Sequence, residues 1–294
     1  MPLDPEVAAY LETQRHLPPR SSLDVAAARE RMRRAAVLAG PVPELAHVED
    51  LMLPGGVRAR DYRPSAGEAL PLAVYFHGGR FFSGDLESHD TTCRQLALAS
   101  GCRIVAVDYR LAPEHRFPAA VDDARIAVDW ALRQGVPVAV AGDSAGANLA
   151  AVAALAHRGA GVRCQLLIYP MIDATCSSPS YAEFAEGYGP GAADMQRGWS
   201  EYLPPGADFR DPAASPFFTA DVRGAAPAFV LTAEFDTLRD EGEAYARKLI
   251  ESGNAVEVRR YLGTIHGFFT MQGILRVARE AVSEAGEYLH RMLT

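Results

Sequence analysis

The chain has 294 residues, of which 49% are hydrophobic and 22% charged, a composition that excludes disordered, collagen-like and low-complexity proteins. Its net charge of −8 argues against general nucleic-acid binding, which needs a basic surface that displaces counterions from phosphates. Lys248 is the one lysine, so neither a Walker phosphate loop nor Schiff-base chemistry is indicated.

The cysteine spacing and the lengths of the apolar runs indicate in which cell compartment the protein is expected. Cys93, Cys102, Cys164 and Cys176 form no C-x-x-C pair and have no histidine at zinc-ligand spacing, so we expect reduced, mostly buried thiols and no metal site. The first 20 residues do not form a signal peptide, and no run approaches the roughly 20 apolar residues of a membrane span. We therefore expect a soluble, cytoplasmic protein that binds no membrane.

Two helices are predicted in the first 40 residues. Apolar residues follow near-helical spacing over 3–16, and prolines end that helix. A serine-capped helix follows over about 24–38 and ends at Gly40. Residues 31–34 read Arg-Met-Arg-Arg, which favours a solvated helix face balanced by nearby acids over a site for an anionic partner.

From about residue 45 the pattern alternates between strands and helices. Residues 48–53 and 57–62 flank a Pro-Gly-Gly turn and predict a hairpin. Further strands are predicted at 72–76, 103–107, 136–141, 165–169, 228–233 and 256–261, and helices at about 88–100, 118–133, 145–158, 239–252 and 273–292. This α/β alternation predicts a mostly parallel central sheet with helices on both faces.

One segment interrupts the alternation. Residues 173–225 have no clear strand and are rich in proline, glycine, serine and aromatics, which is typical of a functional lid or inserted subdomain. We therefore expect residues 1–45 to form N-terminal helices that are part of a cap. Residues 46–172 and 226–294 would form the α/β core, and 173–225 the cap insertion over the carboxyl edge of the sheet.

The strongest chemical signal is the segment Gly142-Asp143-Ser144-Ala145-Gly146. It follows an apolar strand run and precedes a helical run of small residues, which is the context of a nucleophile elbow. In such an elbow a sharp strand-to-helix turn exposes the serine above the sheet, and the start of the helix adds a partial positive charge. Ser144 is therefore the candidate nucleophile.

A serine hydroxyl needs a base, and the base needs an acid that orients it. His266 lies in a loop between the last predicted strand and the last predicted helix, and it is the candidate base. Asp236 directly follows the strand at 228–233 and is the favoured acid, with Glu234 and Asp240 as competitors. The order Ser144, Asp236, His266 is that of α/β hydrolases, and it differs from the trypsin-like and subtilisin-like orders.

A glycine-rich loop supplies candidates for an oxyanion hole. His77-Gly78-Gly79-Arg80 directly follows the strand at 72–76. Backbone N–H groups in such a loop can stabilise the oxyanion that develops during acyl transfer. We expect the amides of Gly78, Gly79 and Ala145 to be the donors.

Together these segments closely resemble those of the hormone-sensitive-lipase-like (bacterial family IV) carboxylesterases of the α/β-hydrolase superfamily. The resemblance spans about residues 70–270 and rests on HGG at 77–79, DYRLAPE at 108–114, FPAA at 117–120, GDSAGANL at 142–149, DTLRD at 236–240 and HGF at 266–268. It implies a serine carboxylesterase that hydrolyses short- to medium-chain esters without a cofactor, with a helical cap and frequent homodimers.

Two positions depart from the family. Arg80 stands where the loop usually has a third glycine, and Thr237 where proline is common. A guanidinium near the cleft would block or recruit an acyl group unless it turns to solvent. We expect Asp143 and Glu114 to support the elbow. Aromatic side chains would line the acyl and alcohol pockets, unless they pack in the core: Phe81, Phe82, Tyr188, Trp199, Phe217, Phe218 and Phe268.

Two alternatives share these residues. One is a catalytically weakened ligand-binding member of the same fold, which the presence of His266 disfavours. The other is an amide or lactone hydrolase, which would use the same triad.

Overall fold

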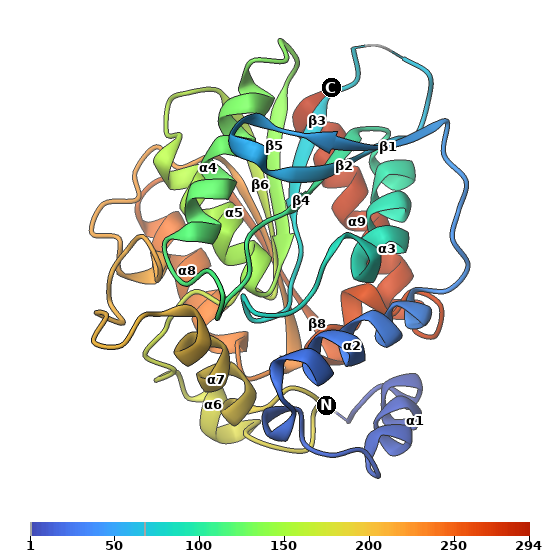
Figure 1. The fold of residues 1–294 in the computed structure, drawn as a ribbon, viewed down its shortest axis with the longest axis vertical. Helices are drawn as coiled ribbons and strands as arrows, with labels where there is room; N and C mark the ends of the chain where they lie inside the picture. The colour runs from blue at the N-terminus through green and yellow to red at the C-terminus, as the bar shows by residue number, and fades with distance from the viewer. Residues whose placement is uncertain (1, 68) are drawn as a thin grey trace.

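The computed structural model describes residues 2–67 and 69–294, which form an eight-stranded sheet covered by helices on both faces (Figure 1). The strand order is β1-β2-β4-β3-β5-β6-β7-β8. The pairs β1/β2 and β2/β4 are antiparallel, and the other five pairs are parallel. The α/β-hydrolase fold, with its mostly parallel sheet and antiparallel hairpin, is confirmed.

The strands and helices fall close to their predicted ranges. The strands are β1 (His47–Met52), β2 (Arg58–Arg63), β3 (Leu72–Phe76), β4 (Arg103–Asp108), β5 (Val138–Asp143), β6 (Val162–Ile168), β7 (Ala228–Phe235) and β8 (Val256–Ile265). The helices are α1 (Pro5–Gln14), α2 (Val25–Ala35), α3 (Leu86–Ser100), α4 (Ala119–Leu132), α5 (Ala145–Ala156), α6 (Ser180–Glu183), α7 (Ala192–Tyr202), α8 (Arg239–Glu251) and α9 (Arg276–Leu293). The largest shift is at β8, which extends to Ile265 instead of ending at 261. Helix α9 begins three residues later than expected and is preceded by a separate 3₁₀ turn, η5 (Phe268–Thr270).

The sheet separates two hydrophobic cores. Helices α3 and α9 pack together on one face, and α4, α5 and α8 cover the other (Figure 1). All five residues of β3 are buried, because helices cover both of its faces. Helix α5 is buried from Ala145 through Leu155, and its many alanines let it lie directly against the sheet.

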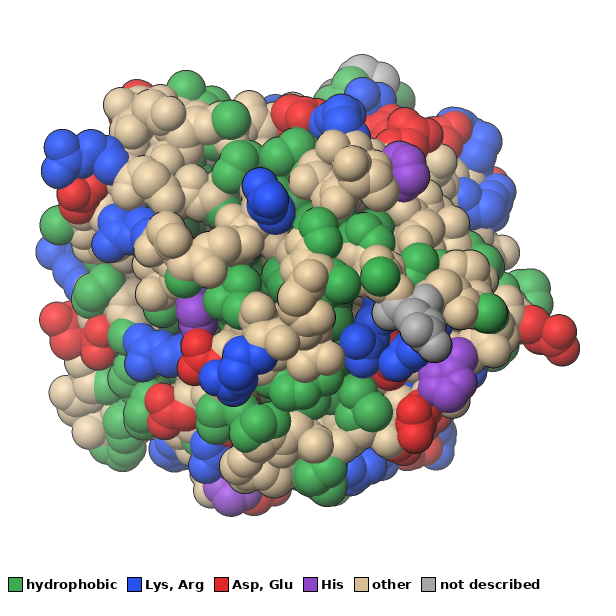
Figure 2. Space-filling view, turned by 90° about the horizontal axis from the view of Figure 1, so that it is seen from above, with side chains coloured by type: hydrophobic (Ala, Val, Ile, Leu, Met, Phe, Trp, Pro, Cys, Tyr) green, Lys and Arg blue, Asp and Glu red, His purple; other side chains and the backbone are tan. Residues whose placement is uncertain are grey.

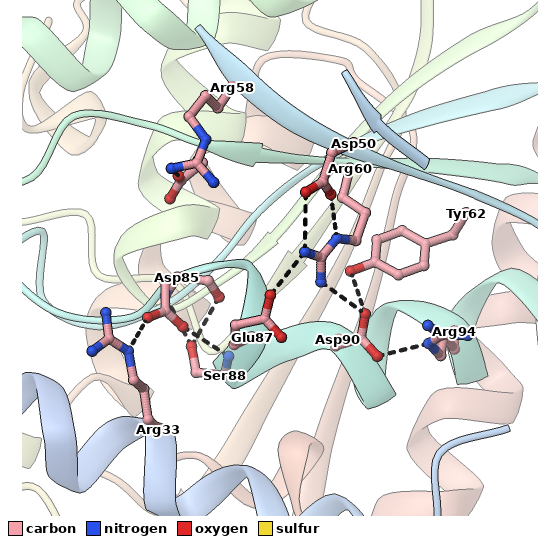
Figure 3. Close-up of polar contacts among 11 residues, drawn as sticks. Arg33, Asp50, Arg58, Arg60, Tyr62, Asp85, Glu87, Ser88, Asp90 and Arg94 are labelled. Atoms are coloured by element: carbon pink, nitrogen blue, oxygen red, sulfur yellow. Dashed lines mark hydrogen bonds and ion pairs between the residues drawn. The ribbon is translucent and has the colours of Figure 1, made fainter. Parts of the chain in front are cut away.

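An ion-pair network joins the hairpin to α3 (Figure 3). Arg60 on β2 contacts Asp50 at 2.6 Å, Glu87 at 2.8 Å and Asp90 at 3.3 Å. The hydroxyl of Tyr62 donates to the same Asp90 carboxylate at 3.0 Å. These side chains attach the antiparallel edge of the sheet to the helix that follows the glycine-rich loop.

Helices α1, α2, α6 and α7 lie together at one end of the molecule (Figure 1). Arg197 on α7 donates to the backbone carbonyls of Ser21 and Leu23, which links the segment 173–225 to the N-terminal segment. Arg33 on α2 pairs with Asp85, the residue that caps α3 (Figure 3). The opposite face of the molecule has basic and acidic side chains interspersed (Figure 2).

Three of the four cysteine thiols are buried, Cys176 is half-buried, and all four are free, as expected from their spacing. Among the described residues, no helix combines the length and apolar character needed to cross a bilayer.

Candidate active site

Ser144 lies at the sharp turn between β5 and α5. Its backbone has φ 54° and ψ −118°, a region that costs a non-glycine residue about 1–3 kcal/mol. The turn is also very close to its neighbours. A Cβ on Gly142 would lie 2.5 Å from the carbonyl oxygen of Gly146, and one on Gly146 would lie 1.9 Å from that of Phe76. Both glycines of the motif are therefore required by backbone contact.

Ser144, His266 and Asp236 are connected by hydrogen bonds. The Ser144 Oγ lies 3.0 Å from Nε2 of His266, and Nδ1 of His266 lies 2.8 Å from Oδ2 of Asp236. The other oxygen of Asp236 accepts the amide of Leu238 at 2.8 Å. All three side chains are buried. The serine is thus placed to transfer its proton to the imidazole, and the carboxylate to fix the tautomer of that ring.

The two competing acids have other partners. Glu234 accepts the amide of Gly263 at 2.6 Å. Asp240 accepts the amide of Ser180 at 2.9 Å and contacts Arg239. The structure therefore brings Asp236, and neither competitor, to His266.

The glycine-rich loop is fixed to the elbow through Asp143. The amide of Gly78 donates to Oδ1 of Asp143 at 2.8 Å, and the hydroxyl of Tyr75 donates to the same oxygen at 2.8 Å. Because the Gly78 amide is already used, our expectation that it is an oxyanion donor is wrong. Its glycine is needed for another reason, since a Cβ there would lie 2.3 Å from Oδ2 of Asp143.

The remaining candidates for oxyanion donors are the amides of Gly79 and Arg80, which directly follow Gly78 in the chain. Among the described residues, no acceptor meets the amides of Gly79 and Arg80, and both residues line the cavity that contains Ser144 and His266. Arg80 has φ 57°, which explains why glycine is usual at this position. Ala145 is the first residue of α5, so no preceding turn of helix accepts from its amide.

The charges beside the loop are fixed by burial and by contacts. Burial, reinforced by the neighbouring ring of His89, lowers the pKa of His77 to about 4, so His77 is neutral at pH 7. Burial alone would raise the pKa of Asp143. His89, whose Nε2 lies 3.3 Å away, together with the bonds from Tyr75 and Gly78, outweighs that effect and holds the pKa below its usual value. Asp143 is therefore a buried carboxylate.

The side chain of Arg80 turns toward α7 rather than to solvent. Its guanidinium stacks over the ring of Phe82 at 4.8 Å and lies 3.4 Å from the Asp194 carboxylate. Burial lowers the pKa of Arg80 to about 10, which leaves it cationic at pH 7. Gly198 on α7 lies against this side chain.

Glu114 does not support the elbow, contrary to our expectation. Its carboxylate forms an exposed bidentate pair with Arg29 on α2, at 2.6 and 2.9 Å. Arg29 in turn donates to the carbonyls of Phe82 and Ala112. Arg29 thus attaches α2 both to Glu114, in the segment after β4, and to Phe82, just after the glycine-rich loop.

The aromatic side chains pack in the core, which was the favoured alternative to lining the pockets. None of these aromatic side chains belongs to the cavity at Ser144, because they pack against one another or against the sheet. Phe81 stacks on Tyr202 at 3.9 Å, Tyr188 stacks on Phe235 at 5.0 Å, and Phe268 packs against Tyr261. Phe82 is sandwiched by arginines, Trp199 contacts Phe81, and Phe217 contacts Phe218.

The cavity itself is small and is completed by distant segments. It has a volume of about 90 Å³, and beside Ser144, His266, Asp143, Gly79 and Arg80 its lining includes Tyr10, Arg20, Met32, Leu38, Met195 and Met271. Sequence reasoning missed these last six, because only the folded chain brings α1, α2 and α7 over the elbow. Among the described residues, no group of three or more His, Cys, Asp or Glu side chains is placed to hold a metal ion.

Comparisons with known proteins agree with this arrangement. A protein family described as alpha/beta hydrolase fold matches residues 73–270, and the chain belongs to it. Within that family the chain is a carboxylester hydrolase. It is 41% identical over 84% of its length to the carboxylic ester hydrolase LipN of Mycobacterium tuberculosis, of which 71% is covered. It is 36% identical to the ethyl acetate hydrolase of Pseudomonas putida over the full length of both chains.

A solved structure gives the same result. The hyperthermophilic esterase of the archaeon Pyrobaculum calidifontis superposes with a TM-score of 0.93 and 43% identity, over 99% of both chains. The similarity therefore includes the N-terminal helices and the segment 173–225 as well as the core.

Proposed function

We propose that this enzyme hydrolyses short- to medium-chain carboxylic esters through an acyl-enzyme on Ser144. The observation that carries the proposal is the hydrogen-bonded series Ser144–His266–Asp236 at the carboxyl edge of the sheet, beside unpartnered loop amides. The chemistry follows from that geometry, and the similarity to named ester hydrolases supports it.

In the first half-reaction the Ser144 Oγ attacks the ester carbonyl carbon while Nε2 of His266 takes the hydroxyl proton. Asp236 stabilises the imidazolium, and the amides of Gly79, Arg80 and Ala145 bind the oxyanion. The C–O bond to the alcohol then breaks, and His266 donates its proton to the leaving oxygen. In the second half-reaction, water activated by His266 attacks the acyl carbon and releases the acid and Ser144.

The volume beside Ser144 favours the short end of the substrate range. The cavity beside Ser144 has a volume of only about 90 Å³. An acetyl or propionyl group fits such a space, whereas a longer acyl chain must reach beyond it, past the N-terminal residues that line the cavity. We assign the covering role to residues 1–45 and 173–225, which together form the cap.

Hydrolysis of p-nitrophenyl acetate, butyrate, octanoate and palmitate tests the proposal. We expect kcat/KM to be highest for acetate or butyrate and to fall with chain length. The Ser144→Ala variant should lose turnover, and Ser283→Ala, an exposed serine on α9, should keep it. An organophosphate ester should add its phosphoryl mass to the wild type and to the Ser283→Ala control only. Turnover or labelling that persists in Ser144→Ala would remove Ser144 from its role.

The homodimer and the cytoplasmic location also remain proposals. Strand β8 is at the edge of the sheet and leaves nearly half of the Val258 and Leu262 side-chain surface exposed. Such an edge is a template for pairing with another strand, which supports a dimer through β8. Light scattering of the purified chain and of a Val258→Lys variant tests this.

A further inference from the structure

The cavity at Ser144 adjoins a larger one formed by the N-terminal segment. The second cavity has a volume of about 480 Å³ and shares Tyr10, Arg20, Ala35 and Leu38 with the first. Its remaining lining is mostly apolar but includes Arg31, Arg34 and Glu30. The two cavities therefore lie side by side, and Arg20 belongs to the lining of both.

Arg20 lies at the junction without a partner. It belongs to the 3₁₀ turn η1 (Arg20–Ser22), it is half-buried, and among the described residues no acceptor or carboxylate contacts its guanidinium. The two other arginines that line the larger cavity, Arg31 and Arg34, each have a hydrogen-bond partner. Arg34 is paired with Glu30 at 2.8 Å, and Arg31 donates only to the neutral carbonyl of Pro18.

The junction has more positive than negative charge. Arg20 lines both cavities, Arg31 and Arg34 line the larger one and Arg80 the smaller one, whereas the lining carboxylates are Glu30 and Asp143. Asp194 lies 3.4 Å from Arg80. One oxygen of Asp194 is further engaged by the amide of Gly191. Burial lowers the pKa of Arg31, and Arg20 lowers it further, so these cations repel one another. An anion placed between them would relieve that repulsion.

This positive site is unusual for a chain whose net charge is −8. The face seen in Figure 2, opposite the α1 and α2 end of the molecule, has basic and acidic side chains interspersed. Arg33 and Arg34 are exposed, and Arg34 pairs with Glu30, as expected of a solvated helix face. Arg31 is half-buried and lines the larger cavity, and Met32 lines the smaller one.

We propose that Arg20, with Arg31 beside it, binds a carboxylate carried by the substrate, so that the enzyme favours monoesters of dicarboxylic acids over neutral esters of the same shape. The proposal rests on the ester hydrolysis proposed above. A guanidinium suits this ligand because its planar fork matches the two carboxylate oxygens. The ester carbonyl would lie at Ser144 in the 90 Å³ cavity, and the carboxylate in the larger one.

The experiment compares monoethyl adipate with ethyl 6-methylheptanoate, in which an isopropyl group replaces the carboxylate. Initial rates from pH-stat titration give kcat and KM for each ester. A hydrogen bond between charged groups is worth roughly 1.5–3 kcal/mol, so Arg20→Gln should lower kcat/KM for the monoester about tenfold or more, mainly through KM. The kcat/KM for the neutral ester should fall less than that for the monoester, so the ratio of the two kcat/KM values reports the contribution of Arg20 to carboxylate binding.

Two variants serve as controls. Arg15→Gln removes the same charge from a surface pair with Glu12, outside both cavities, and should leave both esters unchanged. Arg20→Lys keeps the charge and should recover part of the preference for the monoester, which a purely structural role would not produce. Arg31→Gln should give a smaller loss than Arg20→Gln.

The outcomes separate this inference from the proposed function. The anion site would be overturned if the wild type had equal kcat/KM for both esters. It would also be overturned if the ratio of kcat/KM for the monoester to that for the neutral ester were the same in Arg20→Gln and in Arg15→Gln. The esterase assignment would stand in both cases. If the wild type hydrolyses neither ester, the esterase assignment is refuted, and this inference is refuted with it. A preference removed by Arg20→Gln and partly restored by lysine would establish the site.

Discussion

Asp143 connects the nucleophile elbow to the glycine-rich loop, and its removal should therefore affect both stability and catalysis. The Asp143→Ala variant leaves two buried donors, the Gly78 amide and the Tyr75 hydroxyl, without their acceptor. A buried donor that loses its partner costs about 1–3 kcal/mol, so the expected loss in free energy of unfolding is about 2–6 kcal/mol. That is a large part of the roughly 5–15 kcal/mol typical of a folded protein.

Asp143→Asn keeps an oxygen that can accept both bonds but removes the charge. Charge-assisted hydrogen bonds are about twice as strong as neutral ones, so we expect this variant to lose only about 1–2 kcal/mol. Urea denaturation followed by circular dichroism measures both variants. Asp129→Asn, which changes an exposed carboxylate near His157, is the control and should stay within about 0.5 kcal/mol of the wild type.

The same carboxylate predicts a dependence of stability on pH. Because the folded protein holds the pKa of Asp143 below its usual value, the charged group contributes stability above the unfolded pKa of about 3.9, and this contribution is lost as pH falls toward the folded pKa. Asp143→Asn should lack this part of the acid sensitivity. The reasoning is refuted if Asp143→Ala unfolds within 1 kcal/mol of wild type, or if Asn and Ala cost the same.

Three further predictions concern the surroundings of the site. Gly146→Ala places a Cβ 1.9 Å from the Phe76 carbonyl oxygen, so it should abolish folding or turnover, and a stable, fully active variant would contradict the contact. Arg60→Met leaves three carboxylates of Figure 3 without their shared cation and should cost about 1–3 kcal/mol by urea denaturation, less at high salt. Glu114→Gln weakens one exposed pair and should change stability by less than about 1 kcal/mol, with kcat unchanged.

Much of this structure could be predicted because short stretches of sequence determine the strands, the turns and the helices. Gly142 is required by backbone contact with Gly146 within the strand–turn–helix unit, although Gly146 is required by contact with Phe76 on β3. The apolar strands are predicted because helices bury both of their faces. The order of Ser144, Asp236 and His266 places each residue after its own strand, at the same edge of the sheet. Neighbouring parallel strands bring such residues together, so their meeting follows from topology.

The errors concern contacts between segments that are far apart in the chain. The Gly78 amide was expected to bind an oxyanion, but a glycine's sequence context does not show that a side chain 65 residues later accepts from it. The aromatic side chains offered two roles, lining the pocket or packing in the core, and most of them pack in the core, where their large area is best buried. The cavity is lined instead by α1 and α2, whose helical pattern only predicts that one face is covered.

Arg80 shows why a departure from a family motif need not remove the function that the motif serves. An oxyanion hole uses backbone amides, so position 80 must only hold its N–H toward the cavity. At φ 57° this costs a non-glycine residue roughly 1–2 kcal/mol. The side chain offsets that strain by stacking on Phe82 and pairing with Asp194 of α7. Arg80, which stands where the family usually has glycine, therefore also attaches α7 to the loop beside Ser144.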